Sequence, residues 1–271
     1  NNNPQEKKED FTLKLGFTGF GNMGPAKAVG LVSAKALPSE QIYASAKNWE
    51  KLCKNTSACG IHACRDTGEV IECSDMLVVA VKPYQVRDVL SPYINQLNGK
   101  ILVSVAAGMT FECYEEFLPA GVHHISTIPN TPVSICEGII ACEQRHSLTQ
   151  QEYDVFFNLF SHIGLVQPVE THLLSVAGTV AGCGPAFAAM FLEALSDAGV
   201  KHGLPRALSY RLASQMLAGT AKLQLATNAH PGQMKDAVCS PGGTTIVGVS
   251  ALEKNGFRHA VIDAIDAIEN K

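Results

Sequence analysis

The sequence of 271 residues predicts an α/β domain followed by an all-α domain. Up to residue 169, short runs of β-prone residues alternate with helical patterns, which is typical of a parallel sheet with crossover helices. From residue 170 onwards, strand patterns stop and only helical periodicity remains. We therefore expect a flexible polar tail over residues 1–11, an α/β domain over residues 12–169 and a helical domain over residues 170–271.

One predicted strand, Met76–Val81, is apolar throughout, as expected for a central strand buried on both faces. The other predicted strands, the last two with patterns of more exposed strands, are Leu13–Thr18, Gln41–Ala44, Ile101–Val105, Val122–Ile125, Gly138–Cys142 and Leu165–Val169. The predicted helices are Asn22–Lys35 in the first domain and Pro185–His202, Arg206–Leu225, His230–Val238, Gly243–Lys254 and Arg258–Glu269 in the second.

The helix predicted at Pro185–His202 carries apolar residues on nearly every side, so it must be buried within a domain or between subunits. A domain of about 100 residues is too small to cover several such helices, so we expect a partner copy of the chain. The longest uninterrupted apolar run, Ala186–Leu192, is far shorter than a membrane span. A net charge of −4 without a Lys/Arg block argues against nucleic acid and membrane surfaces as partners.

The nine cysteines indicate a reducing compartment rather than a disulfide framework. Their number is odd, none forms a CxxC pair, and we find no secretory signal at the start of the sequence. The nine histidines show no spacing that would complete a metal site. The sequence therefore predicts a cytoplasmic protein with free thiols and no bound metal.

A glycine-rich turn follows the first predicted strand and opens the first predicted helix. In the motif Gly19-x-Gly21-x-x-Gly24 the first glycine permits a tight turn, the second lets the backbone approach a pyrophosphate, and the third allows close helix–strand packing. Amide groups at the start of the helix would point at this anion. The motif predicts a Rossmann-like dinucleotide-binding domain, and the plain alternative is a glycine-rich turn without a ligand. The predicted cofactor contacts in this turn are Gly19, Phe20, Gly21, Asn22, Met23 and Gly24.

The end of the second strand distinguishes NADP from NAD. An NAD site usually offers an acid to the ribose 2′-hydroxyl at this position. The stretch Tyr43–Asn48 has no acid, but it has a hydroxyl at Ser45 and a cation at Lys47. A carboxylate would repel a 2′-phosphate, whereas a lysine attracts it, so we predict NADPH as the cofactor and NADH as a second candidate. The alternative for Lys47 is an ordinary surface lysine.

Six further segments are informative because of their order and their spacing along the chain. They are Ala80–Pro83, Ser104–Gly108, Ile128–Pro132, Ala181–Phe187, Glu193–Val200 and Lys235–Ile246. In this order the segments resemble the pyrroline-5-carboxylate reductase family, and the similarity extends over Leu13–Ile268. The resemblance implies hydride transfer from NADPH to 1-pyrroline-5-carboxylate, giving L-proline. It also implies an all-α C-terminal dimerisation domain that intertwines two subunits, and a homodimer that assembles into a decamer.

The resemblance also assigns roles to residues outside the glycine turn. The nicotinamide half of the cofactor would be lined by Ala80, Val81, Lys82, Pro83, Ala106, Ala107 and Gly108. Thr67 would face the adenosine. The substrate would be held by Ser240, Gly242, Gly243, Thr244 and Thr245. The chain departs from the residues usual in the family at four positions, where Ser126 replaces an arginine, Asn228 an acid, Thr67 an asparagine and Cys183 a serine.

The stretch Ser240–Thr245 indicates substrate chemistry by itself. The amides of Gly243, Thr244 and Thr245 would begin a helix without intrahelical partners, so they could hold a small carboxylate. The alternative is a serine-capped helix start with no ligand. We interpret Thr245 as the catalytic residue, whose hydroxyl orients the imine nitrogen and can donate a proton to it. If the substrate arrives as an iminium cation, Thr245 only orients the ring.

Two other functions fit parts of the sequence. A β-hydroxyacid dehydrogenase has a similar two-domain build, but it needs a general acid/base, normally a lysine early in the second domain. The stretch Gly178–Leu195 contains no lysine, which counts against alcohol chemistry. A non-catalytic NADP-binding regulator could keep the glycine turn, but it would have little reason to keep Ser240–Thr245.

Overall fold

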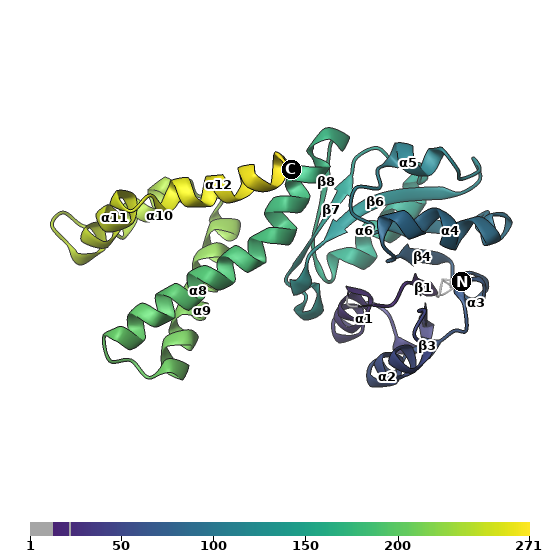
Figure 1. Cartoon of the computed structure of the whole chain (residues 1–271), viewed down its shortest axis with the longest axis horizontal. Helices are drawn as coiled ribbons and strands as arrows, with labels where there is room; N and C mark the ends of the chain where they lie inside the picture. Colours follow the sequence, from purple (N-terminus) through teal and green to yellow (C-terminus); the bar gives the residue numbers. More distant parts are fainter. Residues whose placement is uncertain (1–12, 22) are drawn as a thin grey trace, which may run out of the picture. The chain divides into compact units, whose positions relative to one another are not determined.

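The computed structural model describes residues 13–21 and 23–271, so the expected flexible tail lies outside the described residues. The chain divides into two compact units, Asn1–Gly182 and Cys183–Lys271. The first unit holds a sheet with its helices, and the second unit consists of helices only (Figure 1). The predicted order of an α/β domain followed by an all-α domain is confirmed.

The sheet of the first unit has eight described strands in the order β3-β2-β1-β4-β5-β6-β7-β8. Neighbours from β3 to β6 are parallel, β7 is antiparallel to β6, and β8 is parallel to β7. The first six follow the Rossmann order, in which the direction of winding reverses between β1 and β4. The strands are β1 (Leu15–Thr18), β2 (Ile42–Ser45), β3 (His62–Ala63), β4 (Met76–Val79), β5 (Ile101–Ser104), β6 (His123–Pro129), β7 (Gly138–Glu143) and β8 (Gly164–Val169).

Two predictions about the later strands are wrong. The strand predicted at Val122–Ile125 is β6, which continues to Pro129 because its last residues pair with β7. Strand β7, whose pattern indicates an exposed strand, is largely buried because it lies between β6 and β8. The exposed position belongs to the edge strand β8, where Leu165 is 53% exposed.

Helices cover both faces of the sheet. The alternating side chains of β4 show this directly, because Met76 and Val78 lie in one core whereas Leu77 and Val79 lie in the other. The first core includes residues of α1 (Met23–Ser33), α2 (Trp49–Cys59) and α6 (Gln150–Ser161). The second core includes residues of α3 (Thr67–Cys73), α4 (Val86–Leu90) and α5 (Phe111–Glu115). The prediction of a central strand buried on both faces is confirmed.

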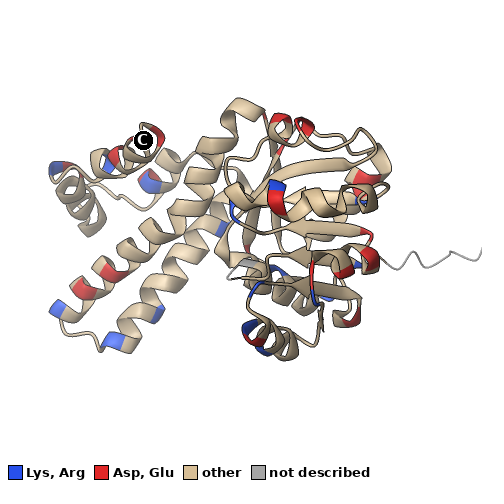
Figure 2. Ribbon diagram, turned by 45° about the vertical axis from the view of Figure 1, so that its right-hand side comes forward, with Lys and Arg blue, Asp and Glu red and all other residues tan. Residues whose placement is uncertain are grey.

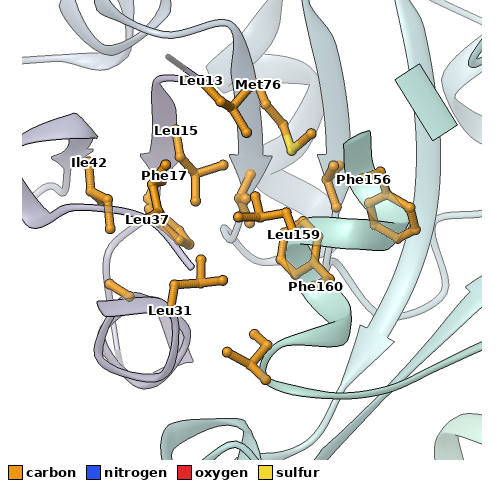
Figure 3. Close-up of a cluster of buried hydrophobic side chains, with 14 of the residues drawn as sticks. Leu13, Leu15, Phe17, Leu31, Leu37, Ile42, Met76, Phe156, Leu159 and Phe160 are labelled. Atoms are coloured by element: carbon orange, nitrogen blue, oxygen red, sulfur yellow. The ribbon is translucent and has the colours of Figure 1, made fainter. Parts of the chain in front are cut away.

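The first core joins segments that are far apart in the sequence (Figure 3). Phe156 and Phe160 of α6, with ring centroids 5.2 Å apart, belong to the same cluster as Leu31 of α1 and Leu15 and Phe17 of β1. Burial of each such side chain stabilises the fold by about 1.5–3 kcal/mol. This packing fixes α1 against the sheet, and the glycine turn lies between β1 and α1.

Short helical turns connect the larger elements of the first unit. They are η1 (Ser39–Gln41), η2 (Pro83–Gln85), η3 (Ser91–Gln96), η4 (Thr131–Ile135), η5 (Thr171–Leu173), α7 (Leu174–Gly178) and the π-helical turn η6 (Thr179–Cys183). Between β6 and η4, the buried side chain of Asn130 accepts a hydrogen bond from the Ile139 N–H (2.8 Å) and donates one to the Ala181 carbonyl (3.1 Å). Loss of this amide would leave both backbone groups without that partner, at a cost of about 1–3 kcal/mol for each unsatisfied group.

The second unit exposes many apolar side chains. Its helices are α8 (Gly184–Lys201), α9 (Arg206–Thr227), α10 (Pro231–Ala237), α11 (Thr244–Lys254) and α12 (Phe257–Glu269). Within this unit, which is fully described, α10, α11 and α12 contain no buried residue. Exposed apolar residues include Met190, Leu225, Val247 and Ile262, and charged residues stand only at intervals along the helices (Figure 2). A single copy therefore leaves uncovered the helical surface for which the sequence predicts a partner.

One helical segment of the described chain, Thr171–Lys201, is long and apolar enough to cross a membrane by length and composition alone. A segment of this kind is weak evidence for a membrane, because helices buried between subunits have the same composition.

Candidate active site

The glycine turn is tied to the neighbouring strand by its backbone. Gly19 has a φ of 84°, a conformation that favours glycine. The N–H groups of Gly19 and Phe20 both donate to the carbonyl of Ser45, at 3.0 and 2.9 Å. A Cβ at Gly19 would lie 2.7 Å from the carbonyl oxygen of Ala80. The turn is thus held between the ends of β2 and β4.

The other two glycines of the motif have different surroundings. A Cβ at Gly24 would lie 2.7 Å from the ring of Phe20, which is buried against Phe17. A Cβ at Gly21 would meet only the carbonyl oxygen of Gly19, at 3.9 Å. Gly24 is therefore required by packing within the protein, whereas the open space at Gly21 is available to a ligand. Asn22 lies outside the described residues, and Met23 is the first residue of α1.

A cleft of about 560 Å³ opens at the carboxyl ends of β1, β4 and β5, a volume typical of small-molecule sites. It brings together ten of the predicted cofactor residues, namely Gly19, Phe20, Gly21, Lys47, Ala80, Val81, Lys82, Pro83, Ala106 and Ala107. A second cleft of about 320 Å³ shares Gly19, Lys47 and Val81 with the first and adds Ser45 and Thr67. The two clefts adjoin at the point where a Rossmann sheet binds a dinucleotide.

Of the predicted cofactor residues whose burial the structure describes, two line neither cleft. Gly24 is buried, and Gly108 has a φ of 78° in the loop that leads to α5. Conversely, Asn48, Lys51 and Arg65 line the clefts although no sequence motif singles them out. Asn48 accepts a hydrogen bond from the Lys51 N–H and caps α2, so it also fixes where that helix begins.

A buried hydroxyl network supports the segment after β5 that lines the larger cleft. The Tyr114 hydroxyl donates to Ser104 Oγ at 2.6 Å, and Ser104 Oγ accepts the N–H of Ala106 at 3.2 Å. The Thr127 hydroxyl donates to the Ser104 carbonyl at 2.7 Å. Burial raises the pKa of Tyr114, so its hydroxyl stays a donor at neutral pH. Ser104 and Tyr114 therefore fix the position of the Ala106 backbone.

Burial also affects a lysine in the helix that follows the glycine turn. Lys27 in α1 is 1% exposed, and desolvation lowers its pKa to about 8. Its side chain lines neither of the two clefts.

The structure explains three of the four departures from the family's usual residues. The Ser126 hydroxyl donates to the Met109 carbonyl at 2.7 Å, and the hydroxyls of Thr67 and Thr18 share a hydrogen bond of 2.8 Å beside the glycine turn. Asn228 ends α9 with a φ of 51°, a left-handed conformation that asparagine tolerates well. Nothing in the structure explains Cys183.

The residues predicted to hold the substrate form an exposed turn in the second unit. The Gly243 N–H donates to the Ser240 carbonyl at 3.0 Å, and Gly242 has a φ of 70°. Gly243 is the N-cap of α11 and no side chain caps the helix there. The serine cap that the alternative interpretation assumes is therefore wrong. The amides of Thr244 and Thr245, in the first turn of α11, have no capping side chain as a partner.

We predict that Gly21→Ala weakens cofactor binding without weakening the fold. The added Cβ would meet no protein atom closer than 3.9 Å, but it would enter the space of a bound pyrophosphate. Loss of the charge-assisted hydrogen bonds made there should raise the Kd for NADPH about tenfold or more. Titration calorimetry and thermal unfolding measure the two effects.

Gly19→Ala is the control, because its Cβ would clash with the Ala80 carbonyl and should lower the melting temperature as well. Unchanged NADPH affinity in Gly21→Ala would contradict a pyrophosphate site at this turn.

Sequence models of two families match the chain. The one described as pyrroline-5-carboxylate reductase dimerisation matches residues 171–271. The one described as NADP oxidoreductase, coenzyme F420-dependent, matches residues 14–108. The exposed helical surface of the second unit thus coincides with a domain named for dimerisation.

Similar proteins cover nearly the whole chain. The pyrroline-5-carboxylate reductase of Treponema pallidum is 46% identical over 259 residues, which are 94% of this chain and 98% of that protein. The enzyme of the same name from Escherichia coli is 37% identical over 93% of this chain and 94% of its own length.

Solved structures of similar proteins have the same fold. The pyrroline carboxylate reductase of Plasmodium falciparum with NADP bound has a TM-score of 0.84 and 30% identity, over 94% of this chain and 95% of that chain. The reductase of Coxiella burnetii has a TM-score of 0.85 and 27% identity, over 96% and 97% of the two chains. On identity and coverage together, the chain belongs to the pyrroline-5-carboxylate reductase family.

Proposed function

We propose that this chain transfers a hydride from NADPH to 1-pyrroline-5-carboxylate and so produces L-proline. The observation that carries the proposal is the full-length similarity to enzymes named for this reaction, at 46% and 37% identity. The glycine-lined clefts of the first unit and the uncapped helix start of the second supply the two binding functions that the reaction needs.

The first unit binds and orients the cofactor, whose nicotinamide supplies the hydride when it is bound. Gly19, Phe20 and Gly21 hold the pyrophosphate, and we expect Asn22, Met23 and Gly24 to be part of the same binding motif. Ser45, Lys47 and Thr67 contact the adenosine end, and the segments Ala80–Pro83 and Ala106–Gly108 flank the nicotinamide. The backbone and the apolar side chains of these two segments would fix the ring and exclude water from it.

The start of α11 holds the substrate carboxylate. The amides of Thr244 and Thr245 lie in the first turn of α11, at its positive end, and a carboxylate there would satisfy both the donors and the helix dipole. Gly243, whose N–H donates to the Ser240 carbonyl, lines the same turn. The side chain of Ser240 and the open backbone at Gly242 complete the turn around this anion. This arrangement binds an acid without an arginine.

Thr245 acts on the imine nitrogen. Hydride addition to the carbon of the C=N bond leaves an electron pair on nitrogen, and the nitrogen must gain a proton if the substrate is a neutral imine. The nitrogen anion that this addition would leave is far more basic than an amine, so even a weakly acidic hydroxyl within hydrogen-bond distance can donate its proton. The hydroxyl then regains a proton from water. With an iminium substrate the nitrogen already carries the proton, and Thr245 orients the ring.

The chain forms a homodimer, and these dimers assemble into a decamer in the cytoplasm. The dimer covers the apolar surface that the helices of the second unit expose. All nine cysteines, which lie in the described residues, are free thiols, in keeping with a reducing compartment. NADH can serve as a second hydride donor, because most predicted contacts involve parts that the two cofactors share.

We predict that the purified enzyme oxidises NADPH in the presence of 1-pyrroline-5-carboxylate and forms one L-proline for each NADPH consumed. Absorbance at the NADPH band and amino-acid analysis follow the two species. Activity with a β-hydroxyacid but not with the imine would favour a hydroxyacid dehydrogenase. Tight NADPH binding without any turnover would favour a regulator.

We further predict that Thr245→Val lowers kcat on the order of a hundredfold while NADPH binding is unchanged, because it removes the donor at the imine nitrogen and keeps the shape of the side chain. Thr245→Ser should recover much of the activity. Thr220→Val is the control, since this exposed threonine lies on α9 and, among the described residues, its hydroxyl bonds only to Met216. Wild-type kcat and KM in Thr245→Val would remove Thr245 from the mechanism.

A further inference from the structure

We propose that Arg65, stacked on Trp49, recognises the 2′-phosphate of NADPH and sets the preference for NADPH over NADH. The proposal rests on the proposed function, because it concerns the adenosine end of the same cofactor site. It adds a residue that no sequence motif indicates and gives it a task distinct from binding the pyrophosphate.

Strand pairing places Arg65 beside the end of β2. Ala44 of β2 lies opposite Ala63 of β3, and the Cys64 N–H donates to the Ala44 carbonyl at 2.8 Å. Arg65 is the next residue and lines the smaller cleft together with Ser45 and Lys47. The position that distinguishes NADP from NAD therefore has two cations, one on each of two neighbouring segments.

The guanidinium of Arg65 is oriented by an aromatic ring rather than by a carboxylate. Its Cζ lies 4.1 Å from the ring centroid of Trp49, the first residue of α2. A guanidinium stacked in this way keeps the N–H donors on its edge free for a ligand. Within the described residues Arg65 forms no ion pair, whereas four other arginines pair with an aspartate or glutamate, namely Arg87, Arg145, Arg206 and Arg258.

These properties match a phosphate. A planar fork of N–H donors can bind two phosphate oxygens at once, which a lysine cannot do. The stacking on Trp49 restricts the guanidinium before the ligand arrives, so less side-chain entropy is lost on binding. Lys47, which lines the same cleft, adds a second positive charge.

Two acids, Asp66 and Asp88, also line this cleft, and an acid at this place can favour NADH over NADPH. The Asp66 carboxylate accepts the Glu69 N–H at 3.0 Å and caps α3, and Asp88 lies on α4. If either acid accepted a hydrogen bond from a free ribose 2′-hydroxyl, the site would favour NADH. The cofactor preference of the protein decides between this outcome and the proposal.

The experiment compares Arg65→Gln with Arg87→Gln. Arg87 also lies over an aromatic ring, Phe117, at 5.0 Å, but it pairs with Glu116 and lines neither cleft. The KM values for NADPH and NADH are measured with 1-pyrroline-5-carboxylate, and the inhibition constants for 2′,5′-ADP and 5′-AMP are measured in parallel. In Arg65→Gln, the KM for NADPH and the inhibition constant of 2′,5′-ADP should both rise about tenfold. The KM for NADH and the inhibition constant of 5′-AMP should stay within about twofold of the wild-type values. Arg87→Gln should match the wild type.

Variants of Trp49 test the stacking. Trp49→Phe keeps a ring under Arg65 and should retain most of the NADPH preference. Trp49→Leu removes the ring and should reduce the NADPH preference towards that of Arg65→Gln. A wild-type preference for NADH, or an equal loss for both cofactors in Arg65→Gln, would overturn the proposal. If the wild type does not reduce the imine, the proposed function fails. Binding of 2′,5′-ADP against 5′-AMP, read from the fluorescence of Trp49, the only tryptophan, still tests Arg65 in that case.

Discussion

The hydrogen bonds from Gly19 and Phe20 to the Ser45 carbonyl are the constraint on which the cofactor site depends. They fix the glycine turn to the end of β2, while the close approach of Gly19 to Ala80 fixes it to the segment after β4. The clefts at the carboxyl edge of the sheet exist because these three chain segments end together there. The parallel register of β2, β1 and β4 brings the segments together, and the two cores on either face hold that register.

Much of this arrangement follows from local sequence patterns. The apolar run at β4 predicts burial on both faces, and the glycine spacing predicts a tight turn between β1 and α1. The antiparallel pairing that extends β6 could not be predicted, since it depends on β7 as a partner rather than on residues of β6. The burial of β7 could not be predicted either, because it depends on β6 and β8 as its neighbours in the sheet.

The residues of the candidate site also fall into two groups, those that a local sequence pattern indicates and those that tertiary contacts bring to the site. Lys47 was predicted because it follows β2 directly in the sequence, whereas Arg65 reaches the same cleft only because β3 pairs with β2. Ser104 lies inside a recognised segment, but its role in holding the Ala106 N–H depends on Tyr114 of α5. Ser126 and Thr67, which depart from the usual residues of the family, each form a hydrogen bond that no local pattern indicates.

We propose that a hydride donor bound at the glycine turn meets an imine held at the start of α11 in the second unit. A crystal structure of the homodimer with NADPH and L-proline would show whether the two meet. We expect the Thr245 hydroxyl to lie within about 3 Å of the proline nitrogen, with the nicotinamide facing the ring on its other side. A structure in which Thr245 lies remote from the nicotinamide in every pairing of subunits would contradict it.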